Sequence, residues 1–245
     1  TALVSIPRNL TRVQFPPGTP LADQYPNGFD DLANAIFPRV TTNEALMEHY
    51  GRDGLQAEAV ALSDALGYSL GIQVDDFALV NMQGFAEVID AVGGVTLDLA
   101  NSVELPPSIP GQRELPGSIG PGAVEMDGAL AIAYVRTRYA DSDYQRMGRQ
   151  RQLLAALGSQ VSATDALGGF GAVTGVLDDS MRTSLSSSGF SDLLDRLGDN
   201  SAIQESVGLI PPLIEPGNPD FDQIRMIIAG IQNAMATGNP SGFAT

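Results

Sequence analysis

The sequence contains no cysteine, which excludes disulfide bonds, thiolate zinc sites and cysteine nucleophiles. Histidine occurs once, as His49, so a metal site built from several histidines is excluded as well. His49 stands beside Tyr50 and a glycine near a predicted turn, and we expect it to be an ordinary surface or capping residue. The side chains left for chemistry are therefore carboxylates, hydroxyls, amides and guanidinium groups.

Long apolar runs are also absent, because none approaches the roughly 20 residues that a helix needs to cross a bilayer. No basic segment followed by an apolar stretch opens the chain. Residues 1–6 already have the pattern of a buried strand, from which we expect the natural protein to have upstream sequence that carries any targeting or anchoring segment. The 245 residues are 43% hydrophobic and 17% charged, which is enough to bury a full core.

Lysine is missing too, so all 13 basic residues are arginine, a preference typical of GC-rich genomes. The formal net charge of −16 argues against nucleic acid as a partner, since such proteins need a basic face. Five of the 13 arginines nevertheless fall in one short stretch, namely Arg136, Arg138, Arg146, Arg149 and Arg151. Cations concentrated locally in an acidic protein indicate an anion-binding site.

Apolar periodicity predicts strands that alternate with helices. The predicted strands are 2–6, 77–80, 95–99, 133–138 and 206–210, and the predicted helices are 31–37, 42–46, 55–66, 85–92, 126–131, 143–161, 190–197 and 221–231. Gly67 is the expected C-cap of the helix that begins near residue 55. Pro/Gly-rich loops are expected at 16–28 and 106–121, and a Gly/Ser-rich loop at 168–188.

Residues 77–99 read as strand, helix and strand, which is typical of a crossover unit between parallel strands. The alternation along the whole chain predicts an α/β fold, in which helices flank a central mixed sheet in three α/β/α layers. We expect one domain over residues 1–237, which lacks its extreme N-terminal part, and a frayed tail over residues 238–245.

The arginine-rich stretch predicts a phosphate site through side-chain geometry. On a strand, residues two apart share a face, so Arg136 and Arg138 are predicted to project together near the C-terminal end of strand 133–138. On a helix, residues three apart share a face, which brings Arg146 and Arg149 together in the first turns of the next helix. Arginine offers planar paired donors to phosphate oxygens.

The start of that next helix strengthens the same prediction. Ser142 and Gln145 match a capping box, which places the free N–H groups of a helix N-terminus beside the arginines. The alternative is a solvated basic face on which the arginines pair with Asp141, Asp143 and neighbouring carboxylates.

Several segments, the arginine block among them, occur in the order of a known family. They are Ser5-Ile6-Pro7-Arg8, Asp76-Phe77 with Gly84-Phe85, residues 88–95, Met126-Asp127-Gly128, and residues 133–138 with Asp143, Arg146, Arg149 and Gln150. Together they resemble the LytR-CpsA-Psr family over residues 2–232, with the arginine block as the most specific part. The lysine-free composition resembles an actinobacterial member.

The resemblance implies a membrane-anchored enzyme on the extracytoplasmic face of the bacterial cell membrane, with an α/β/α fold and a hydrophobic tunnel for a polyprenyl tail. It implies a phosphotransferase that moves a glycopolymer from a polyprenyl diphosphate carrier onto a hydroxyl of peptidoglycan, forming a phosphodiester link. Magnesium commonly assists. By similarity, the diphosphate would be bound by Arg8, Arg136, Arg138, Arg146 and Arg149, while Asp143 and Gln150 would hold these side chains in place.

Two positions depart from the family pattern. Asn9 stands where the family often has aspartate, and an amide can coordinate or hydrogen-bond but cannot act as a base. The family's upstream acidic segment, which helps to hold the metal, would precede Thr1, so the metal ligands stay unassigned. Residues 32–39 match an asparagine-containing stretch of the family only loosely, and Arg39 there is a further candidate for the diphosphate.

Three other interpretations come from the residues themselves. Gly67-Tyr68-Ser69-Leu70-Gly71 fits a G-x-S-x-G nucleophile elbow, but a predicted helix precedes the serine and the sole histidine lies upstream, so we interpret it as a helix cap and turn. Asp141-Ser142-Asp143 matches the D-x-D metal site of some nucleotide-sugar glycosyltransferases. A non-catalytic module that binds wall polymer or lipid diphosphate is the third interpretation.

Overall fold

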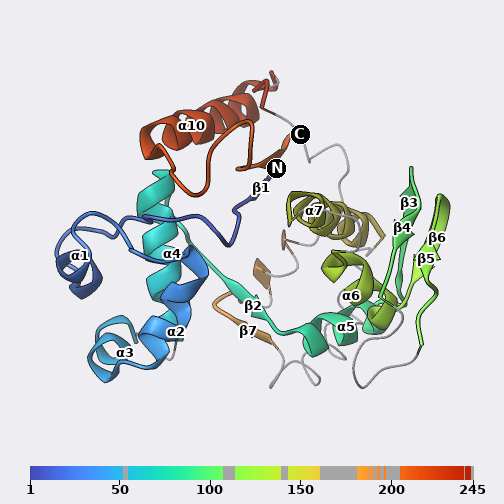
Figure 1. Cartoon of the computed structure of the whole chain (residues 1–245), viewed down its shortest axis with the longest axis horizontal. Coiled ribbons are helices and arrows are strands. Elements are labelled where there is room, and N and C mark those ends of the chain that lie inside the picture. The colour runs from blue at the N-terminus through green and yellow to red at the C-terminus, as the bar shows by residue number, and fades with distance from the viewer. Residues whose placement is uncertain are drawn as a thin grey trace. The chain divides into compact units, whose positions relative to one another are not determined.

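The computed structural model describes residues 1–51, 55–106, 114–138, 143–160, 181–186, 188–189, 192–193, 196, 205–239 and 241–243. The chain folds into two compact units (Figure 1). Unit 1 comprises Ala78–Gln204 with Thr1, and unit 2 comprises Ala2–Phe77 with Glu205–Thr245. The single domain expected over residues 1–237 stays a prediction.

Unit 2 joins the two ends of the chain through a strand pair. Strand β1 (Ala2–Ser5) pairs in parallel with β8 (Glu205–Gly208), with Val4 opposite Val207. The helices of this unit are α1 (Pro20–Gln24), the 3₁₀ helix η1 (Ala33–Ala35), α2 (Ile36–Thr41), α3 (Glu44–Tyr50), α4 (Ala57–Leu70) and α10 (Phe221–Thr237). The predicted strands at 2–6 and 206–210 are therefore confirmed, with small shifts at their ends.

The core of unit 2 lies between α10, α4 and the short helices. Ile224, Ile227, Ile228 and Ile231 are buried at helical spacing, which confirms the final predicted helix. Helix α4 was predicted to end at Gly67, but it continues to Leu70 and ends at Gly71 in the left-handed conformation with φ 71°. Gly67 serves packing instead, because a Cβ there would lie 2.9 Å from the carbonyl oxygen of Ile72. The half-buried Phe243 also packs against this core.

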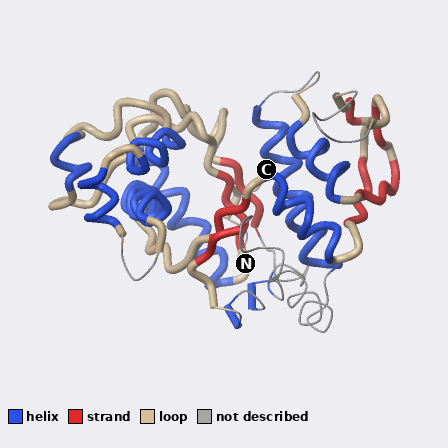
Figure 2. The backbone as a smooth tube through the Cα atoms, turned by 90° about the horizontal axis from the view of Figure 1, so that it is seen from below, coloured by secondary structure: helices blue, strands red, loops and turns tan. Residues whose placement is uncertain are grey.

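The described residues of unit 1 form three two-stranded antiparallel sheets and three helices of nine or more residues. The pairs are β2 (Ala78–Val80) with β7 (Met181–Thr183), β3 (Val95–Leu99) with β6 (Gly122–Met126), and β4 (Val103–Glu104) with β5 (Ser118–Ile119). The helices are α5 (Met82–Ala91), α6 (Gly128–Arg136) and α7 (Asp143–Gln160). Figures 1 and 2 show the strands β3 to β6 together at one end of this unit, beside its helices.

The α/β class is confirmed, but the strands pair differently from the prediction. Among the described residues they form separate two-stranded sheets instead of one central mixed sheet. The predicted crossover is wrong, because β2 and β3 pair with different partners and both ladders are antiparallel. Strand β3 alternates between buried and exposed residues, which is typical of antiparallel sheets with one solvated face, whereas parallel strands are apolar on both faces. The predicted loop at 106–121 likewise contains β5.

The predicted strand at 133–138 is also wrong, since residues 128–136 form α6. Asp127 caps this helix by accepting a hydrogen bond from the backbone N–H of Leu130 at 2.9 Å. Seven of its nine residues are buried, so its sequence lacks the polar positions that mark an amphipathic helix and reads as a short apolar run. The predicted helices at 85–92 and 143–161 are confirmed as α5 and α7. Most of the predicted loop at 168–188 and of the helix at 190–197 lies outside the described residues.

Several residues that carry the family resemblance fix α5 against α6. The Asp90 carboxylate accepts a hydrogen bond from the backbone N–H of Gly128 at 2.7 Å, at the start of α6. Gly94 has φ 93°, and a Cβ there would lie 2.9 Å from the carbonyl oxygen of Met126. At Gly128 the helices approach so closely that a Cβ would lie 2.2 Å from the carbonyl oxygen of Ala86. The residues at these positions therefore serve helix packing and helix capping.

We expect Gly128→Ala to destabilise the protein by about 3 kcal/mol, because the added methyl group must push α5 and α6 apart. Gly148→Ala in α7 is the matched control, since a Cβ there meets nothing within 4 Å. Alanine should raise stability at that position by roughly 0.5 to 1 kcal/mol through its higher helix propensity. Urea unfolding of both variants measures the difference, and equal midpoints would contradict the close contact at Gly128.

Candidate functional site

Two exposed arginines flank a buried threonine at the C-terminal end of α6. Arg136 is the last residue of the helix, and the chain leaves it at Thr137, where ψ is 140°. Thr137 is 3% exposed, and its Oγ1 donates a hydrogen bond to the carbonyl oxygen of Glu104 at 2.8 Å. Arg136 and Arg138 are both exposed. The predicted pair of arginines is thus presented by a helix end rather than by a strand.

Helix α7 holds this end of α6 through a buried arginine. Arg149 is 7% exposed, and its guanidinium lies 5.8 Å from the centre of the Tyr134 ring. Its Nε donates a hydrogen bond to the carbonyl oxygen of Tyr134 at 2.9 Å, and Nη2 donates to the carbonyl oxygen of Thr137. The last carbonyl groups of a helix lack partners within it and carry partial negative charge. Arg149 therefore caps α6.

Two glutamines of α7 complete this contact. Gln150 Nε2 donates to the carbonyl oxygen of Val135 at 3.4 Å, and the Tyr134 hydroxyl donates to Gln152 Oε1 at 2.7 Å. This partner of Gln150 is a backbone carbonyl, and its expected role in holding the arginine side chains stays a prediction. The sequence reasoning missed Thr137 and Gln152. Gln152 could have been found from the sequence, because it follows Arg149 by three residues and therefore lies on the same face of α7.

Arg146 lies one helical turn before Arg149 on α7 and is half-buried. Arg151 in the same helix is half-buried as well, and its burial lowers the pKa of the guanidinium from its ordinary value, although arginine stays protonated at neutral pH. Asp143 begins α7, but its side chain and residues 139–142 lie outside the described residues. The capping box, the D-x-D match and the predicted pairing of arginines with Asp141 and Asp143 fall on them.

A second group of assigned residues belongs to unit 2. Arg8 is exposed in the turn that follows β1, where the backbone N–H of Leu10 donates to the carbonyl oxygen of Pro7. Asn9 Oδ1 is buried and, within the described part of the chain, accepts no hydrogen bond. Arg39 on α2 is half-buried with its guanidinium 6.0 Å from the centre of the Tyr25 ring. The amide oxygen of Asn9 is an oxygen donor available to a ligand.

The G-x-S-x-G match is a helix feature, as interpreted. Ser69 lies within α4 and is fully buried. Its hydroxyl accepts a hydrogen bond from the backbone N–H of Gln14 at 2.8 Å and donates one to the carbonyl oxygen of the same residue at 3.2 Å. Both bonds hold the segment after β1 against α4. Ser69 is therefore a packing residue.

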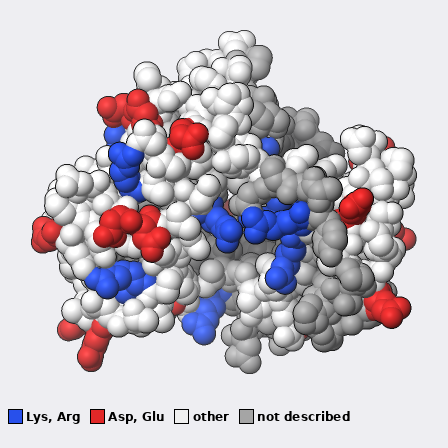
Figure 3. Space-filling model, viewed as in Figure 1, with Lys and Arg blue, Asp and Glu red and all other residues white. Residues whose placement is uncertain are grey.

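The described residues do not bring together enough side-chain ligands for a metal site made of protein groups alone. They contain no cluster of three or more histidine, aspartate or glutamate side chains that could hold an ion. His49 is exposed at the end of α3, as expected. Acidic side chains on the face drawn in Figure 3 lie in separate spots. Over the same described part, no helix is long and apolar enough to span a bilayer.

Comparison with known proteins places these residues in a family context. The model of the LytR_cpsA_psr family matches residues 1–207. The cell wall biosynthesis protein LcpA of Corynebacterium glutamicum is 36% identical over 129 residues, which cover 51% of this chain and 23% of that protein. Polyisoprenyl-teichoic acid–peptidoglycan teichoic acid transferase TagU of Bacillus licheniformis is 28% identical over 134 residues, which cover 54% of this chain and 40% of that protein. The chain thus spans less than half the length of these relatives.

Solved structures show that the fold is shared. The crystal structure of Bacillus subtilis TagV has a TM-score of 0.62 at 20% identity, covering 95% of this chain and 82% of that chain. The structure titled TagT bound to LIIa-WTA has a TM-score of 0.56 at 22% identity, covering 96% of this chain and 79% of that chain. At these identities the similarity supports the fold alone.

Proposed function

The chain belongs to the LytR-CpsA-Psr family, and we propose that it is a phosphotransferase that moves a glycopolymer from a polyprenyl diphosphate carrier onto a hydroxyl of peptidoglycan. Among its relatives is a protein named as a transferase of teichoic acid to peptidoglycan. The proposal includes a phosphodiester link as the product. It also places the protein on the extracytoplasmic face of the bacterial membrane, anchored through a segment outside this chain.

The observation that carries the proposal is the end of α6. Arg136 and Arg138 are exposed there, while the carbonyl groups of the same helix end are already occupied by Arg149. Arg149 thus caps α6, and Arg136 and Arg138 place two further guanidinium groups at the same helix end, both of them exposed. Arg146, one turn from Arg149 on the same face of α7, adds a further positive charge. Such a group of cations favours a ligand with several negative oxygens, as a diphosphate has.

The chemistry requires mainly charge neutralisation. The acceptor hydroxyl attacks the phosphorus atom that carries the glycopolymer and loses its proton to solvent. A new P–O bond forms, and the bond to the bridging oxygen of the diphosphate breaks. Polyprenyl phosphate leaves with the electron pair of that bond. Because negative charge spreads over the phosphoryl oxygens in the transition state, positioned arginines supply much of the catalysis. We assign this role to Arg136, Arg138 and Arg146.

Magnesium fits the described residues only as an ion shared with the substrate. Asn9 Oδ1 is buried without a hydrogen bond in the described part of the chain and is a hard oxygen ligand. Mg²⁺ is usually bound by one or two protein oxygens together with substrate phosphates, and it adds neutralising charge there. We propose that Asn9 is one such ligand. The assignment of Arg8 and Arg39 to the diphosphate rests on the family pattern and is likewise a proposal.

The proposed function predicts turnover by the purified protein. With Mg²⁺, a polyprenyl diphosphate-linked saccharide and peptidoglycan, we expect polyprenyl phosphate to be released and the saccharide to become covalently attached to peptidoglycan. Mass spectrometry detects both products. EDTA should lower the rate. Tight binding of the lipid-linked saccharide without release would support a non-catalytic module instead. Turnover of a nucleotide sugar would support the glycosyltransferase interpretation of the Asp141-Ser142-Asp143 match.

A further inference from the structure

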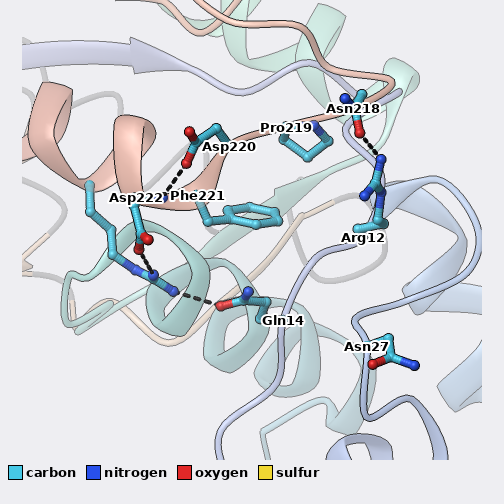
Figure 4. A pocket seen from close by; sticks show the side chains of 9 residues that line it. Arg12, Gln14, Asn27, Asn218, Pro219, Asp220, Phe221 and Asp222 are labelled. Atoms are coloured by element: carbon cyan, nitrogen blue, oxygen red, sulfur yellow. Dashed lines mark hydrogen bonds and ion pairs between the residues drawn. The ribbon is translucent and has the colours of Figure 1, made fainter.

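Unit 2 contains a polar pocket of about 400 Å³ that includes none of the residues assigned to the diphosphate. It is formed by the segment after β1, by Asn27 and by the start of α10 with the residues before it (Figure 4). Its volume is at the lower end of the range for small-molecule sites. None of its lining residues has a functional role predicted from the sequence.

The charges in this pocket are balanced. Its lining includes two arginines, Arg12 and Arg225, and two aspartates, Asp220 and Asp222. Arg225 Nη1 donates to Asp222 Oδ1 at 3.0 Å. With the positive charge matched by carboxylates in the same wall, a phosphate or another anion gains little here. The electrostatics therefore favour an uncharged polar ligand.

After the hydrogen bonds within the pocket wall are formed, both donor and acceptor groups remain for a ligand. Gln14 accepts from Arg225 Nη2 at 2.6 Å through Oε1, and Asn218 accepts from Arg12 through Oδ1, so each keeps an NH₂ group for a ligand. The second carboxylate oxygen of Asp222 is an acceptor. Asn27 makes no side-chain hydrogen bond within the described part of the chain and offers both kinds of group. A hydroxyl group donates and accepts at once, so a ligand rich in hydroxyls matches this wall.

An aromatic ring lies among these polar groups. Figure 4 shows Phe221 between the side chains of Asp222 and Arg12, and the residue is 7% exposed. A saccharide combines hydroxyl groups with apolar C–H faces, and this wall combines amides and carboxylates with the small exposed part of the Phe221 ring. That combination distinguishes a saccharide from a small inorganic ion.

The backbone at Arg12 is held in a strained conformation that fixes this wall. Among the described residues Arg12 is the only non-glycine residue with positive φ, at 53°. Its N–H donates to the carbonyl oxygen of Phe29 at 3.1 Å, and the N–H of Thr11 donates to that of Pro216 at 3.0 Å. A Cβ at Gly28 would lie 2.4 Å from the carbonyl oxygen of Arg12. Strain of this kind concentrates at ligand-binding sites.

We propose that this pocket binds a neutral sugar unit of a polysaccharide. It would be a second, non-reacting site, which goes beyond the proposed transfer function. That function supplies two sources of such a ligand, the transferred glycopolymer and the glycan of peptidoglycan. The shared chemistry, an uncharged pyranose or furanose unit with several hydroxyl groups, follows from the pocket itself.

The test is an NMR titration of the ¹⁵N-labelled chain, which needs no enzymatic activity and so remains informative if the transfer function fails. The probes are chitobiose, which represents the peptidoglycan glycan, galactobiose and arabinobiose, which represent neutral wall polymers, and inorganic phosphate. We expect saturable shifts of the side-chain amide signals of Gln14, Asn27 and Asn218 with a saccharide. The saccharide that binds more tightly identifies the source.

Asn27→Ala should weaken saccharide binding by about fivefold, which corresponds to one lost hydrogen bond. Asn233→Ala is the matched control, because Asn233 is an exposed asparagine of unit 2 outside the pocket. Three results would overturn the proposal: no shift with any saccharide, shifts of these amides by phosphate alone, or equal affinities in the two variants.

Discussion

Arg138→Ala should lower the rate of glycopolymer transfer by about 1,000-fold while leaving the melting temperature nearly unchanged. The rate falls because Arg138 is proposed to neutralise phosphoryl oxygens in the transition state. Stability is retained because Arg138 is exposed, and loss of an exposed arginine usually changes the free energy of unfolding by less than about 0.5 kcal/mol. Transfer kinetics and thermal unfolding of the same preparation measure both quantities.

The control for Arg138→Ala is Arg182→Ala. Arg182 is an exposed arginine of the same unit that lies on β7 opposite Leu79 and has no assigned role. Its replacement should leave transfer within about twofold of the natural chain. Arg138→Lys should recover only part of the activity, since an ammonium group lacks the paired planar donors of a guanidinium. Equal losses of transfer rate in Arg138→Ala and Arg182→Ala would show that the effect comes from the change in net charge and not from the position of Arg138.

Arg149→Ala should have the opposite signature, with a loss of about 3 kcal/mol in the free energy of unfolding. The substitution leaves the carbonyl groups of Tyr134 and Thr137 without their charged donor and opens a cavity beside the Tyr134 ring. For a protein of this size such a loss lowers the melting temperature by roughly 6 to 12 °C. Differential scanning calorimetry and urea unfolding measure it.

Arg149→Lys distinguishes the contribution of the capping hydrogen bonds from that of the positive charge. An ammonium group keeps the charge but cannot reach both carbonyl oxygens in the fixed geometry of the guanidinium, so we expect most of the destabilisation to remain. The family pattern assigns Arg149 to the diphosphate, whereas its burial and hydrogen bonds favour a positioning role at the end of α6. A variant with normal stability and abolished transfer would support direct contact with the substrate.

The sequence predicted best those elements whose periodicity is plain. Helix α10 has an isoleucine stripe on one side, and α7 has an apolar face opposite a polar one. The prediction therefore matched both ends of α7 within one residue and the start of α10, although α10 continues six residues beyond the predicted end at 231. Helix α6 was mistaken for a strand because tertiary burial on all sides removed its polar positions. Strand partners were not predictable, since pairing such as that of β3 with β6 depends on contacts between distant segments.

The geometry around the candidate site residues was not predictable from the sequence. The spacing of Arg136 and Arg138 predicted that both project from one face of a strand, whereas both are exposed on either side of the buried Thr137 at a helix end. Nothing in the sequence distinguished the buried Arg149 from the exposed Arg138, because both are arginines in one charged stretch. Their difference arises from the packing of α7 on α6, which places one side chain against carbonyl groups. The pocket beside Arg12 escaped prediction because its lining residues come from distant segments.

Side chains from two neighbouring helices hold both ends of α6 by hydrogen bonds. Asp90 of α5 accepts from Gly128 at its start, and Arg149 of α7 donates to Tyr134 and Thr137 at its end. Sliding or rotating the helix along its axis would break both sets of hydrogen bonds at once. The backbone that carries Arg136 and Arg138 is therefore held in place, and under the proposed function differences in polymer length or branching would be accommodated by other parts of the chain. Under the proposed function, we expect relatives that act on other polymers to keep these contacts at both ends of α6 and to differ in the residues around it.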